Sequence, residues 1–170
     1  MMITLDSVEH THTLGIKLGN RLRPGDLVIL SGSLGAGKTT LTKGIAAGMG
    51  VTGRVTSPTF VIARVHRPAI SDGRQTDRTV PLVHVDAYRL TGAVELDDLD
   101  LDTDLDAAAV VIEWGEGVAE RLSDERLVIE LVRLPDDTRT ATLTPIGPSW
   151  RARVPEIVTA ATGSSPYGSV

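Results

Sequence analysis

Hydrophobic residues near the N-terminus follow first a helical spacing and then a continuous run. Leucines at every fourth position from Leu14 to Leu22 predict an amphipathic helix, which Asp6 or Ser7 can cap. Residues 27–30 (LVIL) are uniformly apolar, the pattern of a strand buried on both faces of a parallel sheet. The opening segment therefore predicts a helix followed by an interior strand.

A second helix and three further strands follow along the chain. Residues 38–49 place Leu41, Ile45 and Met49 on one stripe, and Gly50 stands where that helix would end. The apolar runs FVIARV, LVHV and AVVI predict strands at residues 60–65, 82–85 and 109–112. A carboxylate comes directly after each of the last two runs.

The C-terminal half contains a hairpin pattern and two polar segments. Residues 127–134 and 140–146 are separated by PDDT, which predicts an antiparallel hairpin at the sheet edge. Residues 117–122 predict a short helix. The aperiodic, turn-rich stretch 67–79 predicts a mobile surface loop, and residues 162–170 (TGSSPYGSV) predict a disordered tail.

Length, cysteine content and charge narrow the classes of function. A chain of 170 residues fits one domain, which we place at residues 1–161. The absence of cysteine excludes disulfides and cysteine-ligated zinc, so any metal is expected to be a hard ion held by oxygens. The net charge of −5 argues against a broad grip on nucleic acid phosphates, including DNA. No apolar run approaches the roughly 20 residues of a membrane span, and the N-terminus lacks signal features, so we expect a cytoplasmic protein without membrane contacts.

A glycine-rich loop between the predicted strand and helix carries the strongest chemical signal. Residues 32–39 (GSLGAGKT) satisfy G-x-x-x-x-G-K-[ST] at every fixed position. Glycines allow the backbone N–H groups to turn inward around a polyphosphate at the helix N-terminus. Lys38 can reach the β and γ phosphates, and the Thr39 hydroxyl can bind Mg²⁺. The alternative, a glycine-rich connector with an exposed lysine, does not explain the position of the loop between strand and helix.

Two carboxylates are placed to complete such a site. Asp86 and Glu113 follow apolar runs, and ligands of open α/β sheets gather at the carboxyl ends of strands. Glu113 is predicted to bind Mg²⁺ directly or through water, and Asp86 to join the magnesium shell or to orient the attacking water. The two carboxylates can exchange these roles. His84, inside a strand, is predicted to pack or to form hydrogen bonds rather than to bind a ligand.

Three further features have two interpretations each. Trp114 would face away from Glu113 in an extended strand but not in a turn, and it suits a structural role as well as nucleotide stacking or partner docking. Residues 57–59 (SPT) are typical of a switch segment or of a simple turn. The acidic stretch 97–106 is either a solvated face or a docking surface for a basic partner.

Missing motifs reduce the classes of nucleotide-dependent protein. The chain lacks N-K-x-D and D-x-x-G elements, which argues against a typical GTPase, and it has no Gly-Gly pair for a transporter signature. A small-molecule kinase remains open, because arginines of the predicted loop region could form a lid over phosphates. These arginines are Arg64, Arg67, Arg74 and Arg78.

The motifs together resemble the TsaE (YjeE) family of bacterial ATPases. The matching segments are GSLGAGKTT, SPTF, HVDAYRL and IEWGEG, beginning at residues 32, 57, 84 and 112. The resemblance implies an α/β fold of the P-loop NTPase type, a three-layer sandwich in which helices cover both faces of a mixed, mostly parallel sheet. It also implies Lys38, Asp86 and Glu113 as catalytic residues and Thr39 and Glu113 as the metal site. The nucleotide-binding residues would be Ser33, Leu34, Gly35, Ala36, Gly37, Lys38, Thr39, Thr40 and Trp114.

The function implied by the resemblance is the making of threonylcarbamoyladenosine at position 37 of tRNA. Family members hydrolyse ATP weakly, use Mg²⁺, and work with the proteins TsaB and TsaD, so tRNA is met only through that complex. TsaD transfers the threonylcarbamoyl group, and the ATPase resets the complex between turnovers. Ser33 departs from the aspartate of most relatives, and the 67–79 loop is longer than expected. A small-molecule kinase and a nucleotide-sensing scaffold without hydrolysis are the alternatives.

Overall fold

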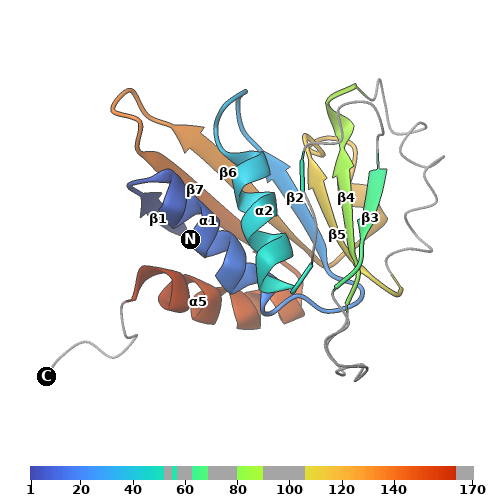
Figure 1. Cartoon of the computed structure of the whole chain (residues 1–170). Coiled ribbons are helices and arrows are strands. Elements are labelled where there is room, and N and C mark those ends of the chain that lie inside the picture. Colours follow the sequence, from blue (N-terminus) through green and yellow to red (C-terminus); the bar gives the residue numbers. More distant parts are fainter. Residues whose placement is uncertain (52–54, 57–62, 69–79, 90–105, 164–170) are drawn as a thin grey trace, which may run out of the picture.

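The computed structural model describes residues 1–51, 55–56, 63–68, 80–89 and 106–163, and the structural statements below concern these residues (Figure 1). They form a seven-stranded sheet covered by helices. The elements are β1 (Met2–Leu5), α1 (Val8–Gly19), β2 (Leu27–Ser31), α2 (Lys38–Gly48), β3 (Ala63–His66), β4 (Leu82–Asp86), η1 (Ala87–Arg89), β5 (Ala109–Glu113), η2 (Glu120–Leu122), β6 (Arg126–Arg133), β7 (Arg139–Ile146) and α5 (Pro148–Thr162).

The sheet is mixed, with parallel strands at its centre and antiparallel strands at both sides. Its order is β1-β7-β6-β2-β5-β4-β3. Strands β6, β2, β5 and β4 are parallel neighbours, whereas β1–β7, β7–β6 and β4–β3 pair in antiparallel fashion. The expected α/β sheet is confirmed, but it is not mostly parallel, because half of its strand pairs are antiparallel. The β6–β7 hairpin is also not at the edge, since β1 pairs outside β7.

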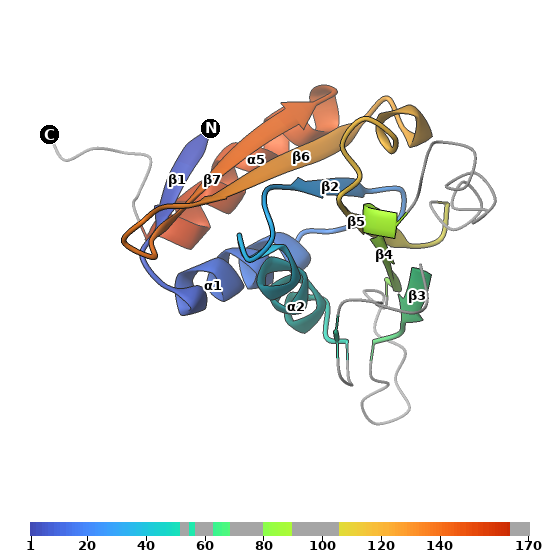
Figure 2. The same ribbon diagram turned by 90° about the horizontal axis from the view of Figure 1, so that it is seen from above.

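Three α-helices pack on one face of the sheet. Side chains of α1, α2 and α5 share one apolar cluster with inward residues of β1, β2, β5, β6 and β7. Figure 2 shows α1 and α2 side by side along this face. A second cluster on the other face joins strand residues to Ala119 and the flanking residues Val118 and Leu122. Among the described residues, the segment that contains η2 covers this second face. A layer of α-helices on this face stays a prediction.

Helices α1 and α2 approach each other closely through glycine. A Cβ atom added to Gly44 would lie 2.2 Å from the His12 carbonyl oxygen, and one added to Gly15 would lie 2.4 Å from the Leu41 carbonyl oxygen. Both distances are far below van der Waals contact, so only glycine allows this backbone spacing. Because α2 begins at Lys38, the helix contact also fixes the position of the glycine-rich loop. Ser7 caps α1 as predicted, since its Oγ accepts a hydrogen bond from the His10 N–H.

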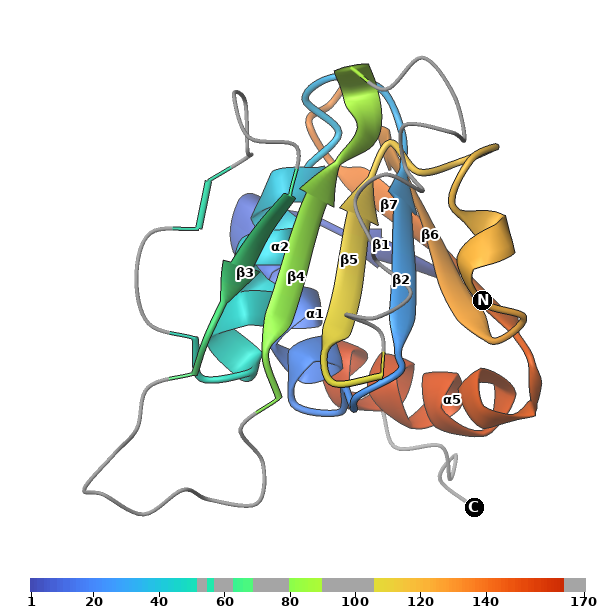
Figure 3. The same ribbon diagram turned by 90° about the vertical axis from the view of Figure 1, so that its right-hand side faces the viewer.

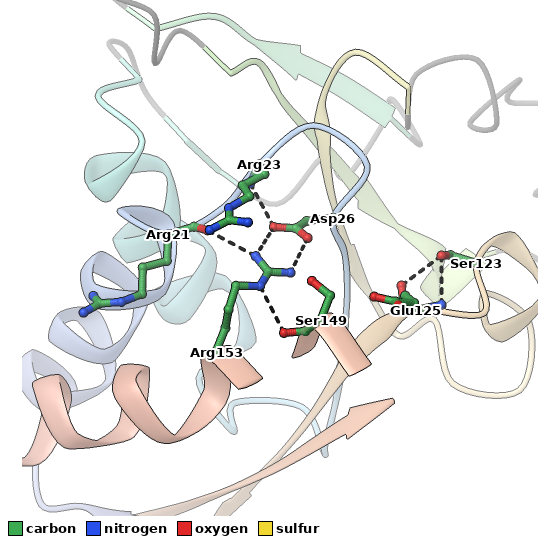
Figure 4. Close-up of polar contacts among 7 residues, drawn as sticks. All are labelled: Arg21, Arg23, Asp26, Ser123, Glu125, Ser149 and Arg153. Atoms are coloured by element: carbon green, nitrogen blue, oxygen red, sulfur yellow. Dashed lines mark hydrogen bonds and ion pairs between the residues drawn. The ribbon is translucent and has the colours of Figure 1, made fainter. Parts of the chain in front are cut away.

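The last described helix is joined to the turn before β2 by a largely buried ion pair (Figure 4). Arg153 of α5 donates to both carboxylate oxygens of Asp26, at 2.7 and 2.6 Å, and also to the Arg21 carbonyl oxygen at 3.2 Å. Its guanidinium carbon lies 4.1 Å from the centre of the Trp150 ring. Sequence periodicity did not predict α5, which contains Pro155. The helix includes Thr162, the first residue of the predicted tail, and residues 164–170 lie outside the described ranges.

The remaining sequence predictions are met in part. Strands β4 and β5 match their apolar runs, and the predicted short helix at 117–122 is the 3₁₀ helix η2. Strand β3 covers the end of the predicted 60–65 strand. Of the expected mobile loop, Arg67 and Pro68 are described and the rest is not. Within the described ranges, no helix combines the length and apolar character needed to cross a bilayer.

Candidate functional site

The glycine-rich loop joins the carboxyl end of β2 to the first turn of α2, at the end of the sheet where β2, β4 and β5 all point the same way (Figure 3). Gly32, Gly35 and Gly37 have φ angles of 128°, 79° and 113°, which other residues rarely adopt. A Cβ on Gly32 would lie 2.1 Å from the Leu131 carbonyl oxygen, so this glycine is required by space as well. Ser33 and Leu34 are exposed at the loop tip, and Leu34 is 89% exposed.

Lys38 folds back from the start of α2 into this loop. Its Nζ donates hydrogen bonds to the carbonyl oxygens of Gly32 at 2.6 Å and Ser33 at 2.9 Å. The same nitrogen lies 3.5 Å from the centre of the Trp114 ring, and the residue is only 5% exposed. Burial lowers the pKa of the Lys38 ammonium group, while the charges of Glu113 and Asp86 raise it. A cation is thus held inside the loop by groups that a phosphate can replace.

Glu113 lies beside the first turn of α2 and has three side-chain hydrogen-bond partners. Its Oε2 accepts from the Thr39 hydroxyl at 2.9 Å, and its Oε1 from the Thr42 hydroxyl at 3.2 Å. The Nε2 atom of His84 is 2.9 Å from the same Oε1. Glu113 is 2% exposed. The structure therefore brings Thr39 and Glu113 together, as the metal-site prediction requires.

Asp86 ends β4 directly opposite Glu113 in the parallel pair β4–β5. Both carboxylates thus stand at the carboxyl ends of adjacent strands, as the apolar runs predicted. Asp86 Oδ1 accepts a hydrogen bond from the Tyr88 N–H at 3.1 Å, and Asp86 is one of the two charges that raise the pKa of Lys38. Asp86 is less buried than Glu113, so a solvent molecule can reach its carboxylate more easily.

Trp114 leaves the strand in a left-handed conformation with a φ of 62°. The alternation of an extended strand therefore fails at this residue, and its ring faces the glycine-rich loop on the side of Lys38. The Tyr88 ring lies 5.1 Å from it, centre to centre. Trp114 also packs at the margin of the second apolar cluster, so it contributes to structure as well as to the site.

A cavity of about 510 Å³ opens next to the loop, and it is lined by Ser31, Gly32, Trp114, Glu116, Gly117 and Glu130. Its floor is the β2 and β6 side of the sheet end, and its wall is the segment after β5. The cavity adds space beside the Lys38 and Trp114 contact without adding a basic side chain. Its two glutamates make this side of the loop acidic.

The structure places the other predicted residues less centrally. Gly35, Ala36 and Gly37 complete the loop, and Thr40 lies half-buried in the first turn of α2. Arg64 and Arg67 are exposed on or just after the edge strand β3. Residues 57–59, Arg74, Arg78 and most of the acidic stretch 97–106 lie outside the described residues.

Sequence reasoning missed Thr42 and was right about His84. His84 is fully buried and forms a hydrogen bond, as predicted for a strand histidine. Thr42 stands three positions after Thr39, and this spacing places both hydroxyls on the same face of α2. That spacing was the available signal, but a threonine inside an apolar helical stripe gives no indication of its own that it faces a carboxylate.

Comparisons with known proteins agree on one family. Residues 5–141 match the family model described as threonylcarbamoyl adenosine biosynthesis protein TsaE. Among curated relatives, the tRNA threonylcarbamoyladenosine biosynthesis protein TsaE of Streptomyces coelicolor is 54% identical over 81% of this chain and 91% of its own length. The protein of the same name from Bacillus subtilis is 42% identical over 74% and 73%. A crystal structure of YdiB from Bacillus subtilis matches with a TM-score of 0.72 and 31% identity, covering 93% of each chain.

Proposed function

The chain belongs to the TsaE family of threonylcarbamoyl adenosine biosynthesis proteins, and on that premise we propose that it binds and slowly hydrolyses Mg²⁺-ATP for this tRNA modification. The observation that carries the proposal is the joint position of Lys38 inside the glycine-rich loop and of Thr39 against Glu113. In this reading the fold is of the P-loop NTPase type, with β2, the loop and α2 forming the phosphate-binding unit.

The loop and Lys38 would bind the polyphosphate. Backbone N–H groups of residues 33–39, at the N-terminus of α2, attract phosphate oxygens. Lys38 would exchange the carbonyl oxygens of Gly32 and Ser33 for the β and γ phosphate oxygens, which carry more negative charge. Because the lysine is already buried, little further desolvation opposes this exchange. The nucleotide would thus take the place of the two loop carbonyl oxygens as partner of Lys38.

The residues present fit a magnesium ion. Thr39 and Glu113 supply a hydroxyl and a carboxylate oxygen, the ligand type that hard cations prefer. The three donors to Glu113 are two hydroxyls and an imidazole, none of which is a permanent cation, so its charge remains available to an incoming ion. When bound, Mg²⁺ would neutralise charge that develops on the transferring phosphoryl group. Asp86, more open to solvent, would orient the attacking water.

The proposed biological role is to reset a complex with TsaB and TsaD rather than to form the new bond on tRNA. Two observations support an accessory role. The net charge of −5 is unfavourable for direct tRNA binding, so tRNA would be met through the partners. Within the described residues, the cavity beside the loop is lined by Glu116 and Glu130 and by no basic side chain, which also disfavours tRNA phosphates on this side of the loop.

Equilibrium binding and turnover test the proposal directly. ADP affinity is measured with and without Mg²⁺, and ATP hydrolysis with and without TsaB and TsaD, for wild type and Lys38→Ala. We expect the wild type to bind ADP more tightly with Mg²⁺ and to hydrolyse ATP slowly unless the partners are present. Lys38→Ala should lose both ADP binding and ATP hydrolysis. Absence of nucleotide binding by the wild type would refute the proposal. For the kinase alternative, the two described arginines of the predicted lid, Arg64 and Arg67, are exposed on or just after the edge strand β3.

A further inference from the structure

We propose that Thr42 and His84 are positioning residues that fix the Glu113 carboxylate with Oε2 turned toward Thr39. Neither residue would touch the nucleotide or the metal. Both contact the opposite oxygen, Oε1, at 3.2 Å from the Thr42 hydroxyl and 2.9 Å from His84 Nε2. The inference rests on the proposed magnesium site, because its consequence is a defined orientation of one metal ligand.

A glutamate needs such contacts if its orientation is to be fixed. The last torsion of the side chain is broad and nearly two-fold, so the carboxylate has little intrinsic preference for one rotation. The two carboxylate oxygens are equivalent, so a half-turn changes nothing, but any smaller rotation of the Glu113 carboxylate would weaken the hydrogen bonds of Thr42 and His84 together. These two donors come from α2 on one side and from β4 on the other, which are separately anchored elements. The carboxylate is therefore held between a helix and a strand.

The hydroxyl of Thr42 has two acceptors within reach but only one hydrogen. The Lys38 carbonyl oxygen lies 3.0 Å away and Glu113 Oε1 lies 3.2 Å away. A hydrogen bond to an ionised acceptor is about twice as strong as one between neutral groups, so the carboxylate is the preferred acceptor. Removing the hydroxyl should therefore change Glu113 rather than the helix backbone, whose i to i−4 pairing does not need it.

His84 must present a protonated Nε2 to act as a donor to Glu113. Its Nδ1 is then an acceptor, and within the described part of the chain this buried atom has no hydrogen-bond partner. Burying an unpaired polar atom is costly. A leucine of similar size would remove the unpaired Nδ1 atom but would also remove the hydrogen bond to Glu113. With histidine at position 84, the protein keeps that hydrogen bond and leaves Nδ1 unpaired. The orientation of Glu113 thus comes with a local cost in stability.

The first experiment measures the Mg²⁺ concentration that gives half of the metal-dependent gain in affinity for a fluorescent ADP analogue. Thr42→Val should raise this concentration about tenfold, since removing partners of a metal ligand typically costs 10- to 100-fold in metal affinity. Thr42→Ser, which keeps the hydroxyl, should have the same half-maximal Mg²⁺ concentration as wild type. His84→Leu and His84→Gln form the matching pair, because the glutamine amide can donate where Nε2 does. Affinity for the analogue without metal should stay within twofold of wild type in all four variants.

A double-mutant comparison separates positioning from a general structural effect. In a Glu113→Ala background, Thr42→Val should produce no further change in the Mg²⁺ requirement. An unchanged requirement in Thr42→Val, an equal effect in the Glu113→Ala background, or an equal loss of metal-free affinity would each overturn the inference.

A second measurement does not depend on nucleotide or metal. In protein labelled with ¹⁵N-histidine, the His84 ring should be the Nε2-protonated tautomer, and its Nε2–H signal should move upfield in Glu113→Ala. A ring protonated only on Nδ1 overturns the inference. If wild type binds no nucleotide, the proposed function fails by itself, and this signal still decides whether His84 holds Glu113.

Discussion

Gly44→Ala tests whether the close contact of α1 and α2 positions the glycine-rich loop. The new methyl group would lie 2.2 Å from the His12 carbonyl oxygen and 3.0 Å from the Gly15 Cα atom. To reach ordinary contact the helices must separate locally by ~1 Å, because both obstructing atoms belong to backbone and cannot move as a side chain would. Helix α2 starts at Lys38, so this movement should displace the glycine-rich loop and the proposed phosphate site.

Two opposing effects set the size of the stability change. Overpacking costs about 1–3 kcal/mol, and a contact with backbone places this variant near the upper end. Alanine in place of glycine favours the helix by about 1 kcal/mol. The expected net loss is therefore about 2 kcal/mol in free energy of unfolding, measured by urea denaturation.

A matched variant separates the helix contact from backbone strain. Gly50→Ala introduces a methyl group into open space at a φ of 72°, so it should lose about 1 kcal/mol by strain alone and keep wild-type ADP affinity. Gly44→Ala should lose both stability and ADP affinity. If Gly44→Ala is as stable as wild type and binds ADP normally, the helix contact does not position the loop.

Three further predictions concern other parts of the molecule. Asp26→Ala should cost about 3 kcal/mol in urea unfolding, because it leaves the largely buried Arg153 without a counter-ion. Adding Arg153→Met should recover part of the loss. Burial and, to a lesser degree, the charge of His84 lower the pKa of His66 below 6.5. The unfolded chain therefore binds more protons than the folded protein just below that pH, and the free energy of unfolding should rise with pH through this window. His66→Gln should flatten that slope. Nucleotide binding should draw the ammonium group of Lys38 away from the Trp114 ring and so change the fluorescence of Trp114. Trp114→Phe should abolish this change, while the fluorescence of Trp150 persists.

The sequence predicted those elements in which a local pattern and the tertiary structure agree. Residues 27–30 and 109–112 are buried strands because both faces of the central sheet are covered, and each ends in a residue of the site. The glycine-rich loop was predictable because its conformation depends on residue type at fixed positions. Asp86 and Glu113 were found together because parallel strands bring their carboxyl ends to one edge.

Other features depend on partners distant in the sequence. Strand β1 has only four residues, too few to show a period, and it exists through pairing with β7. Helix α5 is anchored by the ion pair of Arg153 with Asp26, 127 residues away. Thr42 meets Glu113 only because α2 packs beside β5, which brings together two residues 71 positions apart. Trp114 turns toward the loop through a left-handed backbone conformation that its sequence position did not indicate.

Reconstitution of the modification reaction tests the central claim most directly. Purified TsaB, TsaD, tRNA and the threonylcarbamoyl donor are combined with ATP and either wild type or Lys38→Ala. The measured quantity is the number of modified tRNA molecules formed per complex. The account predicts many rounds with wild type and a single round with the variant, because the ATPase would reset the complex rather than form the bond. The account would be contradicted if Lys38→Ala supported as many rounds as wild type, or if it supported no round of modification at all.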